Sequence, residues 1–348
     1  MKSLKKSVAW AGLFTVSVLW GMDGYRIEPV NFTQVKFADK FWAPRIRQNQ
    51  EITIPVALKH CYNTGRVDNF KKAAKMMGGY FDPKALTFDD TDIYKIIEGI
   101  SYSIQTFPNE KLEREADELI ALIGKAQEGD GYLFTPRTAG DPDNLHPWIS
   151  KKRWEKDPDL SHELYNCGHL YEAAVAHYRA TGKRTFLDIA IKNADLLVRD
   201  FGPGKLAYEP GHQIVEMGLT KMYRVTGKKE YLDLAKFFLD LKGNGKGHSG
   251  EYSQTHKPVI QQDEAVGHAV RAVYMYSGMA DVAALSGNED YIRATDAIWE
   301  NVVSKKLYIT GGIGARAHGE AFDVNYKLPN QCILELQAVF AARRRKVL

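Results

Sequence analysis

The chain has 348 residues, of which 44% are hydrophobic and 11% aromatic, enough apolar material for a substantial folded core. Its formal net charge is +4, but basic residues at the two ends carry +7, so the rest of the chain is about −3. A body with more acid than base lacks the basic face that a nucleic-acid binder needs, and no internal segment is apolar for long enough to span a bilayer. We therefore expect neither class of protein.

The first 24 residues have the pattern of a secretory signal. Three lysines within Met1–Lys6 precede an apolar run from Val8 to Trp20, which is short for a spanning helix, and Gly21 follows. We expect residues 1–24 to be a signal peptide, with export to the periplasm or the exterior and no membrane attachment after cleavage. The alternative is an uncleaved N-terminal anchor.

The rest of the chain has mainly helical periodicity. Apolar residues recur every three or four positions in four segments: Leu112–Ile123, Tyr165–Tyr178, Phe186–Val198 and Val215–Tyr223. Only Tyr25–Val35 and Leu307–Ile309 resemble strands. The acidic cluster Asp89, Asp90 and Asp92 precedes a helical segment, where we expect capping and solvation.

A repeat appears when the helices are aligned on the loops that join them. Segments beginning at His177, Met222 and Ala283 each contain a helix end, a Ser/Thr-Gly turn, an aromatic residue and a new amphipathic helix. The turn glycines are Gly182, Gly227 and Gly287, as expected where a helix ends in the left-handed conformation. Stacked hairpins of this kind form either an open solenoid or a closed α/α toroid, and the unequal loops favour the toroid.

Histidines stand near the start of the first helix of each hairpin. His162, His212 and His268 lie 20, 15 and 19 residues before the three turn glycines, which agrees to within about one helical turn. We expect the three imidazoles to converge on one pocket and to contact a hydroxyl-rich ligand; His169, two turns after His162, is a further candidate. No HExxH is present, and Cys61, Cys167 and Cys332 are too widely spaced for a local metal motif.

A glycine-rich segment, Tyr308–Asn330, presents Glu320 close to Phe322. It lacks the Walker Lys-Ser/Thr and the strand-GxGxxG-helix unit of nucleotide-binding loops. A carboxyl group beside an aromatic ring at a pocket mouth suits a general acid, so Glu320 is the candidate catalytic residue.

These features together resemble glycoside hydrolase family 127, the β-L-arabinofuranosidase-like enzymes. The matching segments run from about Phe41 to Asn330 in family order and include FWAPRIRQNQEITIP, TGRVDNF, FDDTDIYKIIEG, DGYLFTP, HELYNCGHLYEAAVAHY, PGHQIVEMGLTKMY, DEAVGHAVRAVYMYSGMADVA and TGGIGARAHGEAF. The resemblance implies an all-α fold, an (α/α)6 barrel over residues 25–330 that is incomplete at its C-terminal end, and a carbohydrate substrate.

The resemblance also implies a chemistry and site residues. It implies removal of terminal β-L-arabinofuranose, or a related sugar, from plant-type glycans with retention of configuration. Glu320 matches the family's general acid/base, and His162, His212 and His268 match its sugar-contacting histidines. The family nucleophile is a cysteine thiolate held on zinc by a glutamate and further cysteines.

The chain departs from the family pattern after Asn330. Glu335 stands near the expected glutamate, but Gln337 occupies the position of a family cysteine, and the sequence contains no adjacent cysteine pair. We therefore expect residues 331–348 to be an aberrant tail, zinc not to be bound by this chain, and the chain to be a catalytically inactive fragment.

Two other functions remain open from the residues. One is another α/α-toroid sugar enzyme, such as an epimerase or an unsaturated uronyl hydrolase, working without metal. The other is a non-enzymatic helical repeat module that binds a partner through its concave face, in which case the histidines would contact no sugar.

Overall fold

The structure, a computed structural model, describes residues 30–244 and 250–329. The expected signal peptide (residues 1–24) and the expected tail (331–348) lie outside these residues. Within them, the secondary structure is helical and the only β-type pairing consists of isolated bridges. The expectation of an all-α fold is therefore confirmed. No helix in these two stretches is both long and apolar enough to cross a bilayer.

Twelve α-helices and four short 3-10 or π segments are found in the described residues. They are η1 (Phe32–Gln34), α1 (Trp42–Gln48), η2 (Asn49–Thr53), α2 (Ile54–Asn63), α3 (Arg66–Ala73), α4 (Asp90–Thr106), α5 (Glu110–Ala126), α6 (Thr135–Thr138), α7 (Glu163–Thr181), α8 (Thr185–Asp200), α9 (Val215–Thr226), α10 (Lys229–Leu241), η3 (Gly250–Ser253), η4 (Val259–Gln261), α11 (Ala269–Ser286) and α12 (Glu289–Lys305).

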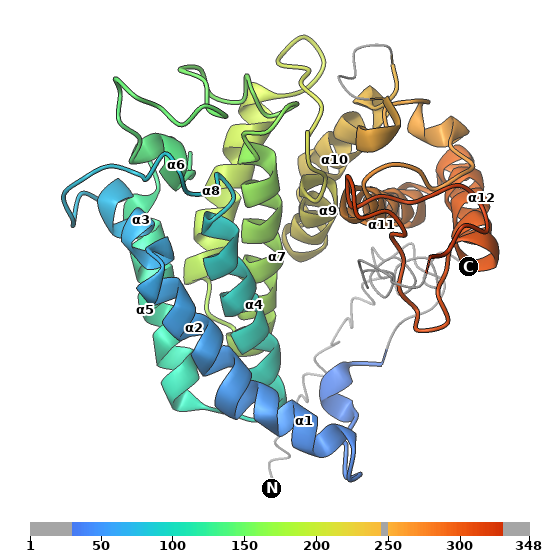
Figure 1. Ribbon diagram of the computed structural model, residues 1–348. Helices are drawn as coiled ribbons and strands as arrows, with labels where there is room; N and C mark the ends of the chain where they lie inside the picture. The colour runs from blue at the N-terminus through green and yellow to red at the C-terminus, as the bar shows by residue number, and fades with distance from the viewer. Residues whose placement is uncertain (1–29, 245–249, 330–348) are drawn as a thin grey trace, which may run out of the picture.

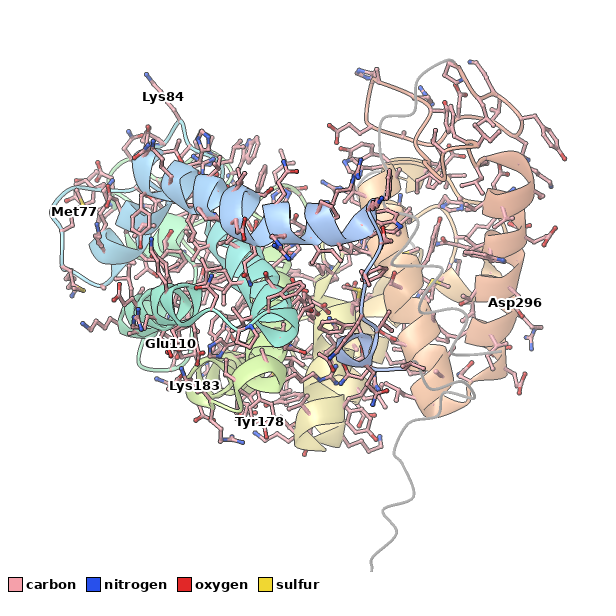
Figure 2. The ribbon with its side chains drawn as sticks, turned by 90° about the horizontal axis from the view of Figure 1, so that it is seen from below. Met77, Lys84, Glu110, Tyr178, Lys183 and Asp296 are labelled. Atoms are coloured by element: carbon pink, nitrogen blue, oxygen red, sulfur yellow. The ribbon has the colours of Figure 1, made fainter. Side chains whose placement is uncertain are left out.

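Four helical hairpins follow one another in the described part of the chain: α4/α5, α7/α8, α9/α10 and α11/α12. The first helices of the hairpins pack side by side in the order α4, α7, α9, α11, and the second helices pack outside them. Figure 1 shows that the short α4/α5 and α7/α8 connections lie at the lower end of these hairpins and that long loops lie at their upper end. Figure 2 views the molecule from the lower end, with Tyr178 and Lys183 flanking the α7/α8 turn.

In the α7/α8 and α11/α12 hairpins, the extent of burial identifies the inner helix. Helix α7 is buried without interruption from Glu163 to His177, and most of α11 is buried too. A helix that is covered on all sides belongs in the interior, whereas α5, α8, α10 and α12 have one apolar face, as expected of an outer layer. All four segments predicted to be helical lie within helices.

The turn glycines adopt the conformation that the repeat predicts. Gly182, Gly227 and Gly287 end α7, α9 and α11 with φ values of 73°, 74° and 66°, in the left-handed region. Their amide groups donate to the carbonyl oxygen four residues earlier, at 2.8, 2.7 and 2.9 Å. The toroid-type stacking of inner and outer helices is therefore built from the predicted hairpins.

Three local expectations are wrong. The described part of Tyr25–Val35 is not a strand, because Phe32–Gln34 forms the 3-10 segment η1. Leu307–Ile309 is not a strand, because the Tyr308 amide and carbonyl bond to Gly312 and Gly311 and so close a turn. Asp89 makes no side-chain capping bond: Asp89 and Asp90 are buried. Arg66 forms a salt bridge with Asp89, and the amide group of Thr135 donates to Asp90 at 2.8 Å, so both carboxyl groups hold tertiary structure together.

Candidate active site

A pocket opens at the upper end of the inner helices, where α7, α9 and α11 begin. Its volume is about 330 Å³, and it is lined by Phe88, Trp148, Leu160, His162, Tyr165, His212, Tyr252, His268, Val270, Arg271 and Glu320. The three histidines predicted to converge and the predicted general acid therefore meet in one cavity. Their chemical roles remain predictions.

The three imidazoles form a row across the beginnings of successive inner helices. His162 and His268 are the N-cap residues of α7 and α11, and His212 lies three residues before α9. The ring centroid of His212 is 5.8 Å from that of His162 and 5.7 Å from that of His268. The equivalent positions in the repeat therefore place the rings next to one another, with angles of 39° and 75° between successive rings.

Glu320 reaches the row from the loop that follows α12. Its Oε2 atom lies 3.2 Å from Nε2 of His268, and its carbonyl oxygen accepts a hydrogen bond of 2.9 Å from the amide group of Ala269. Ala321 forms antiparallel bridges with both Arg316 and His268, so the glycine-rich loop is fastened to the start of α11. The side chain of Glu320 is 58% exposed, whereas that of His268 is 10% exposed. The carboxyl group thus stands at the mouth of the pocket and the imidazole inside it.

Burial keeps the histidines neutral near neutral pH. Desolvation is the main cause that lowers the pKa of His162 to about 4 and that of His212 well below its usual range. It also lowers the pKa of His268, with the Arg271 guanidinium acting in the same direction and the Glu320 carboxylate opposing it. A neutral imidazole has one donor and one acceptor nitrogen, which suits recognition of hydroxyl groups.

A buried carboxyl group joins the segments that carry the first two histidines. Asp157 accepts hydrogen bonds from the amide groups of Leu164, at the start of α7, and Gly211, directly before His212, at 2.7 and 3.2 Å. Arg271 on α11 donates to the carbonyl oxygen of Gly211. The beginnings of α7 and α11 are thereby tied to the segment that presents His212 and leads into α9.

The aromatic lining of the pocket and the hydrogen bonds of Asp157 and Arg271 were not predicted from the sequence. The Phe88 ring lies 4.9 Å from the His162 ring, and the Tyr165 ring 4.4 Å from the His212 ring. Tyr165 shares a helix with His162 and was open to prediction from spacing, whereas Phe88 lies far away in the sequence. His169 does not line the pocket: it is buried below Tyr165, at a ring distance of 4.6 Å.

The described residues do not offer a zinc site of the kind that the family resemblance implies. Cys61 and Cys167 are free, buried and carried by different helices, α2 and α7. Burial raises the pKa of the Cys61 thiol to about 11 and that of Cys167 well above its usual range, the opposite of what a metal thiolate needs. In the two described stretches, no group of three or more His, Cys, Asp or Glu side chains is arranged to hold a metal ion. Cys332, Glu335 and Gln337 lie outside them.

Comparison with known proteins agrees with this fold. The family model described as "Beta-L-arabinofuranosidase, GH127 catalytic domain" matches residues 34–335, which places the chain in the α/α-barrel class of glycoside hydrolase domains. The chain belongs to glycoside hydrolase family 127.

Individual relatives are similar over most of this chain. It is 35% identical to the non-reducing end β-L-arabinofuranosidase of Bifidobacterium longum subsp. longum, over 76% of this chain and 42% of that protein. A solved family 127 β-arabinofuranosidase matches with 53% identity and a TM-score of 0.88, over 93% of this chain and 52% of the other. A family 127 β-L-arabinofuranosidase from Geobacillus stearothermophilus T6 matches with 37% identity and a TM-score of 0.82, over 89% and 52%. These solved structures have the (α/α)6 barrel, and the chain spans about half the length of the relatives.

Proposed function

We propose that the pocket binds the terminal β-L-arabinofuranose unit, or a closely related sugar, of a plant-type glycan, as the sugar site of a retaining glycosidase. The observation that carries this proposal is the row of three neutral imidazoles ending at one carboxyl group, inside a cavity of about 330 Å³. Such a volume is at the small end of ligand pockets and suits a single sugar unit. The names of the relatives support arabinofuranose as the sugar.

In this proposal Glu320 is the general acid/base. Its carboxyl group stands at the mouth, where the glycosidic oxygen and the leaving group would lie, and it donates a proton to that oxygen as the bond breaks. In the second half of a retaining reaction the same carboxylate accepts a proton from water. His268 holds the carboxyl group in place and fixes its orientation towards the pocket.

The nucleophilic half of the reaction has no candidate among the described residues. Because Cys61 and Cys167 do not fit a zinc-bound thiolate, we derive no step through such a group. The 348-residue sequence also contains no adjacent cysteine pair. We propose that this chain binds the sugar weakly and does not hydrolyse it.

Calorimetric titration of the full chain tests the proposal. We expect methyl β-L-arabinofuranoside to bind with a dissociation constant of about millimolar, and methyl β-D-xylopyranoside to bind at least about tenfold more weakly. His212→Ala and His268→Ala should each abolish binding, whereas His60→Ala, which changes an exposed histidine on α2, should not.

The same titration separates the rival functions. Equal binding of both glycosides would end the proposal of an arabinofuranose site. No binding by a folded chain would end it as well and would favour the helical repeat module. Release of arabinose from an arabinofuranoside by this chain would overturn the proposed inactivity while leaving the sugar site intact.

We further propose that the chain is exported, with residues 1–24 as its signal. The support is the basic segment followed by the short apolar run at the N-terminus. Fractionation of the producing cells should place the protein outside the cytoplasm, and deletion of Val8–Trp20 should retain it inside.

A further inference from the structure

We infer that Trp148 is a specificity-determining residue that closes the end of the pocket remote from Glu320 and limits it to one terminal furanose unit. This inference rests on the proposed function and names the side chain that makes the site accept only the end of a glycan.

Trp148 and Glu320 lie at opposite ends of the histidine row. Glu320 contacts the last imidazole, that of His268, whereas the indole of Trp148 lies beside the first, with its centroid 6.4 Å from the His162 ring and an angle of 32° between the rings. His212 lies between the two other histidines. Both Trp148 and Glu320 line the cavity, so a ligand on the histidines has the carboxyl group at one end and the indole at the other.

The loop that carries Trp148 is held in place independently of any ligand. The Trp148 amide group donates to Nδ1 of His146 at 3.1 Å, and the Lys156 ammonium group donates to the carbonyl oxygen of Pro147 at 2.8 Å. The guanidinium group of Arg137 donates to the carbonyl oxygens two and three residues after Trp148, at 2.7 and 2.6 Å. The backbone on both sides of Trp148 is therefore anchored, and the Trp148 ring packs against the His146 ring with centroids 5.3 Å apart, so that the indole forms a wall without any ligand.

The position of Glu320 determines which part of a bound sugar faces Trp148. The glycosidic oxygen of a bound sugar must lie within hydrogen-bond reach of Glu320, so the part of the sugar furthest from that bond points towards Trp148. An indole face offers apolar contact to C–H groups but no acceptor for a hydroxyl group. A further sugar joined to that end of the ring would collide with the indole. An internal unit of a glycan would therefore not fit.

The probes must show whether Trp148 excludes a substituent on the sugar or only touches the sugar. We would titrate the full chain and the Trp148→Ala variant with methyl β-L-arabinofuranoside and with its 2-, 3- and 5-O-methyl ethers. An added methyl group in a closed apolar site lowers binding about tenfold or more. For each protein, the readout is the ratio of each ether's dissociation constant to that of the parent glycoside. This ratio does not change when a substitution weakens binding of the ether and of the parent equally.

We expect one ether, with its methoxyl group against the indole, to bind the unmodified chain at least about tenfold more weakly than the parent, and its ratio to fall close to one in Trp148→Ala. The ethers blocked at hydroxyl groups that face the histidines should stay weak in the variant. Trp148→Phe, which keeps a ring at the wall, should retain most of the discrimination. Trp42→Ala, at an exposed tryptophan on α1, is the matched control and should change nothing.

Two outcomes would overturn the inference. One is that every ether binds the unmodified chain as tightly as the parent, and the other is that the ratios are the same in Trp148→Ala. Failure of the parent glycoside to bind the unmodified chain would instead refute the proposed function itself. Thermal unfolding of Trp148→Ala shows whether the variant is folded. If it is not, Trp148→Leu, which removes the indole but keeps an apolar side chain, supplies the measurement.

Discussion

The Nε2 atom of His268 lies 3.2 Å from Oε2 of Glu320, and the two residues come from opposite sides of a helical hairpin. His268 caps the start of α11, whereas Glu320 follows α12 and returns to that start, where its carbonyl oxygen accepts the Ala269 amide. Because the two groups lie this close together, the charge of the Glu320 carboxylate affects proton uptake by the His268 imidazole. The pair is therefore open to a direct titration test.

Glu320→Gln should lower the pKa of His268. The Glu320 carboxylate raises that pKa against the desolvation that lowers it, so its removal leaves desolvation and the Arg271 charge unopposed. Histidine NMR resonances followed from pH 8 to pH 4 measure the shift. Glu264→Gln, which removes the partner of Lys306, is a control that should leave His268 unchanged. An unchanged or raised His268 pKa in Glu320→Gln would show that the two side chains are not in contact.

His162 should make the fold less stable in mild acid. Burial lowers its pKa to about 4, against an ordinary value of about 6.5 in the unfolded chain, so the unfolded state takes up the proton first as the pH falls. The stability that neutral His162 contributes is fully present above about pH 6.5 and is lost as the pH falls towards about 4. At pH 5 the loss amounts to about 2 kcal/mol.

Urea unfolding at pH 7 and pH 5 measures this loss. The difference between the two free energies of unfolding should be smaller in His162→Gln than in the unmodified chain by about that amount. His60→Gln, at an exposed histidine, should keep the original difference. Equal pH dependence in His162→Gln and the unmodified chain would mean that His162 titrates normally.

The repeat made much of the fold and the convergence of the histidines predictable. A Ser/Thr-Gly turn is a local signal, since only the glycine enters the left-handed conformation without strain, and it fixed the ends of α7, α9 and α11. Because the histidines hold similar positions relative to these turns, they had to meet at the same end of the inner layer. Resemblance to the family supplied the barrel and the role expected of Glu320.

Contacts between distant segments were not predictable from the same signals. Phe88, Trp148 and Arg271 line the pocket from three parts of the chain, and no spacing rule connects them. His169 shows where spacing misleads: two helical turns return a side chain to the same face, but they also move it about 10 Å along the axis. It therefore lies under the pocket, beside Tyr165, and not in it.

Two glycines should respond very differently to alanine because different forces select them. At Gly182 a Cβ atom would meet nothing within 4 Å, so only the left-handed backbone resists, at about 1 kcal/mol. At Gly168 it would lie 2.5 Å from Cγ2 of Ile214 and 2.7 Å from the backbone nitrogen of Val215. Gly168→Ala must therefore push α9 away from α7, at a cost of about 3 kcal/mol or more.

The two variants differ in sugar binding as well as in stability. Ile214 lies two residues after His212, so displacement of α9 by Gly168→Ala should weaken binding of methyl β-L-arabinofuranoside. Gly182→Ala acts at the opposite end and should leave binding unchanged, and Gly182→Asn should regain stability because Asn tolerates the left-handed region. Chemical unfolding and calorimetry measure both effects; equal losses of stability in the two alanine variants would show that α7 and α9 are not in close contact.

Removal of metal should leave sugar binding by this chain unchanged. In the proposed sugar site the imidazoles bind hydroxyl groups as neutral donors and acceptors, and the described cysteines are buried thiols with raised pKa values, so neither group requires zinc. After dialysis, elemental analysis should find well under one zinc ion per chain, and titration with methyl β-L-arabinofuranoside in the presence of EDTA should give the same dissociation constant. Cys61→Ser and Cys167→Ser should likewise not alter binding.

The opposite outcome is that the chain retains zinc stoichiometrically and loses it in Cys332→Ser. The metal is then held by that thiolate. The proposed inactivity must in that case be abandoned, because a metal thiolate would be available as the nucleophile.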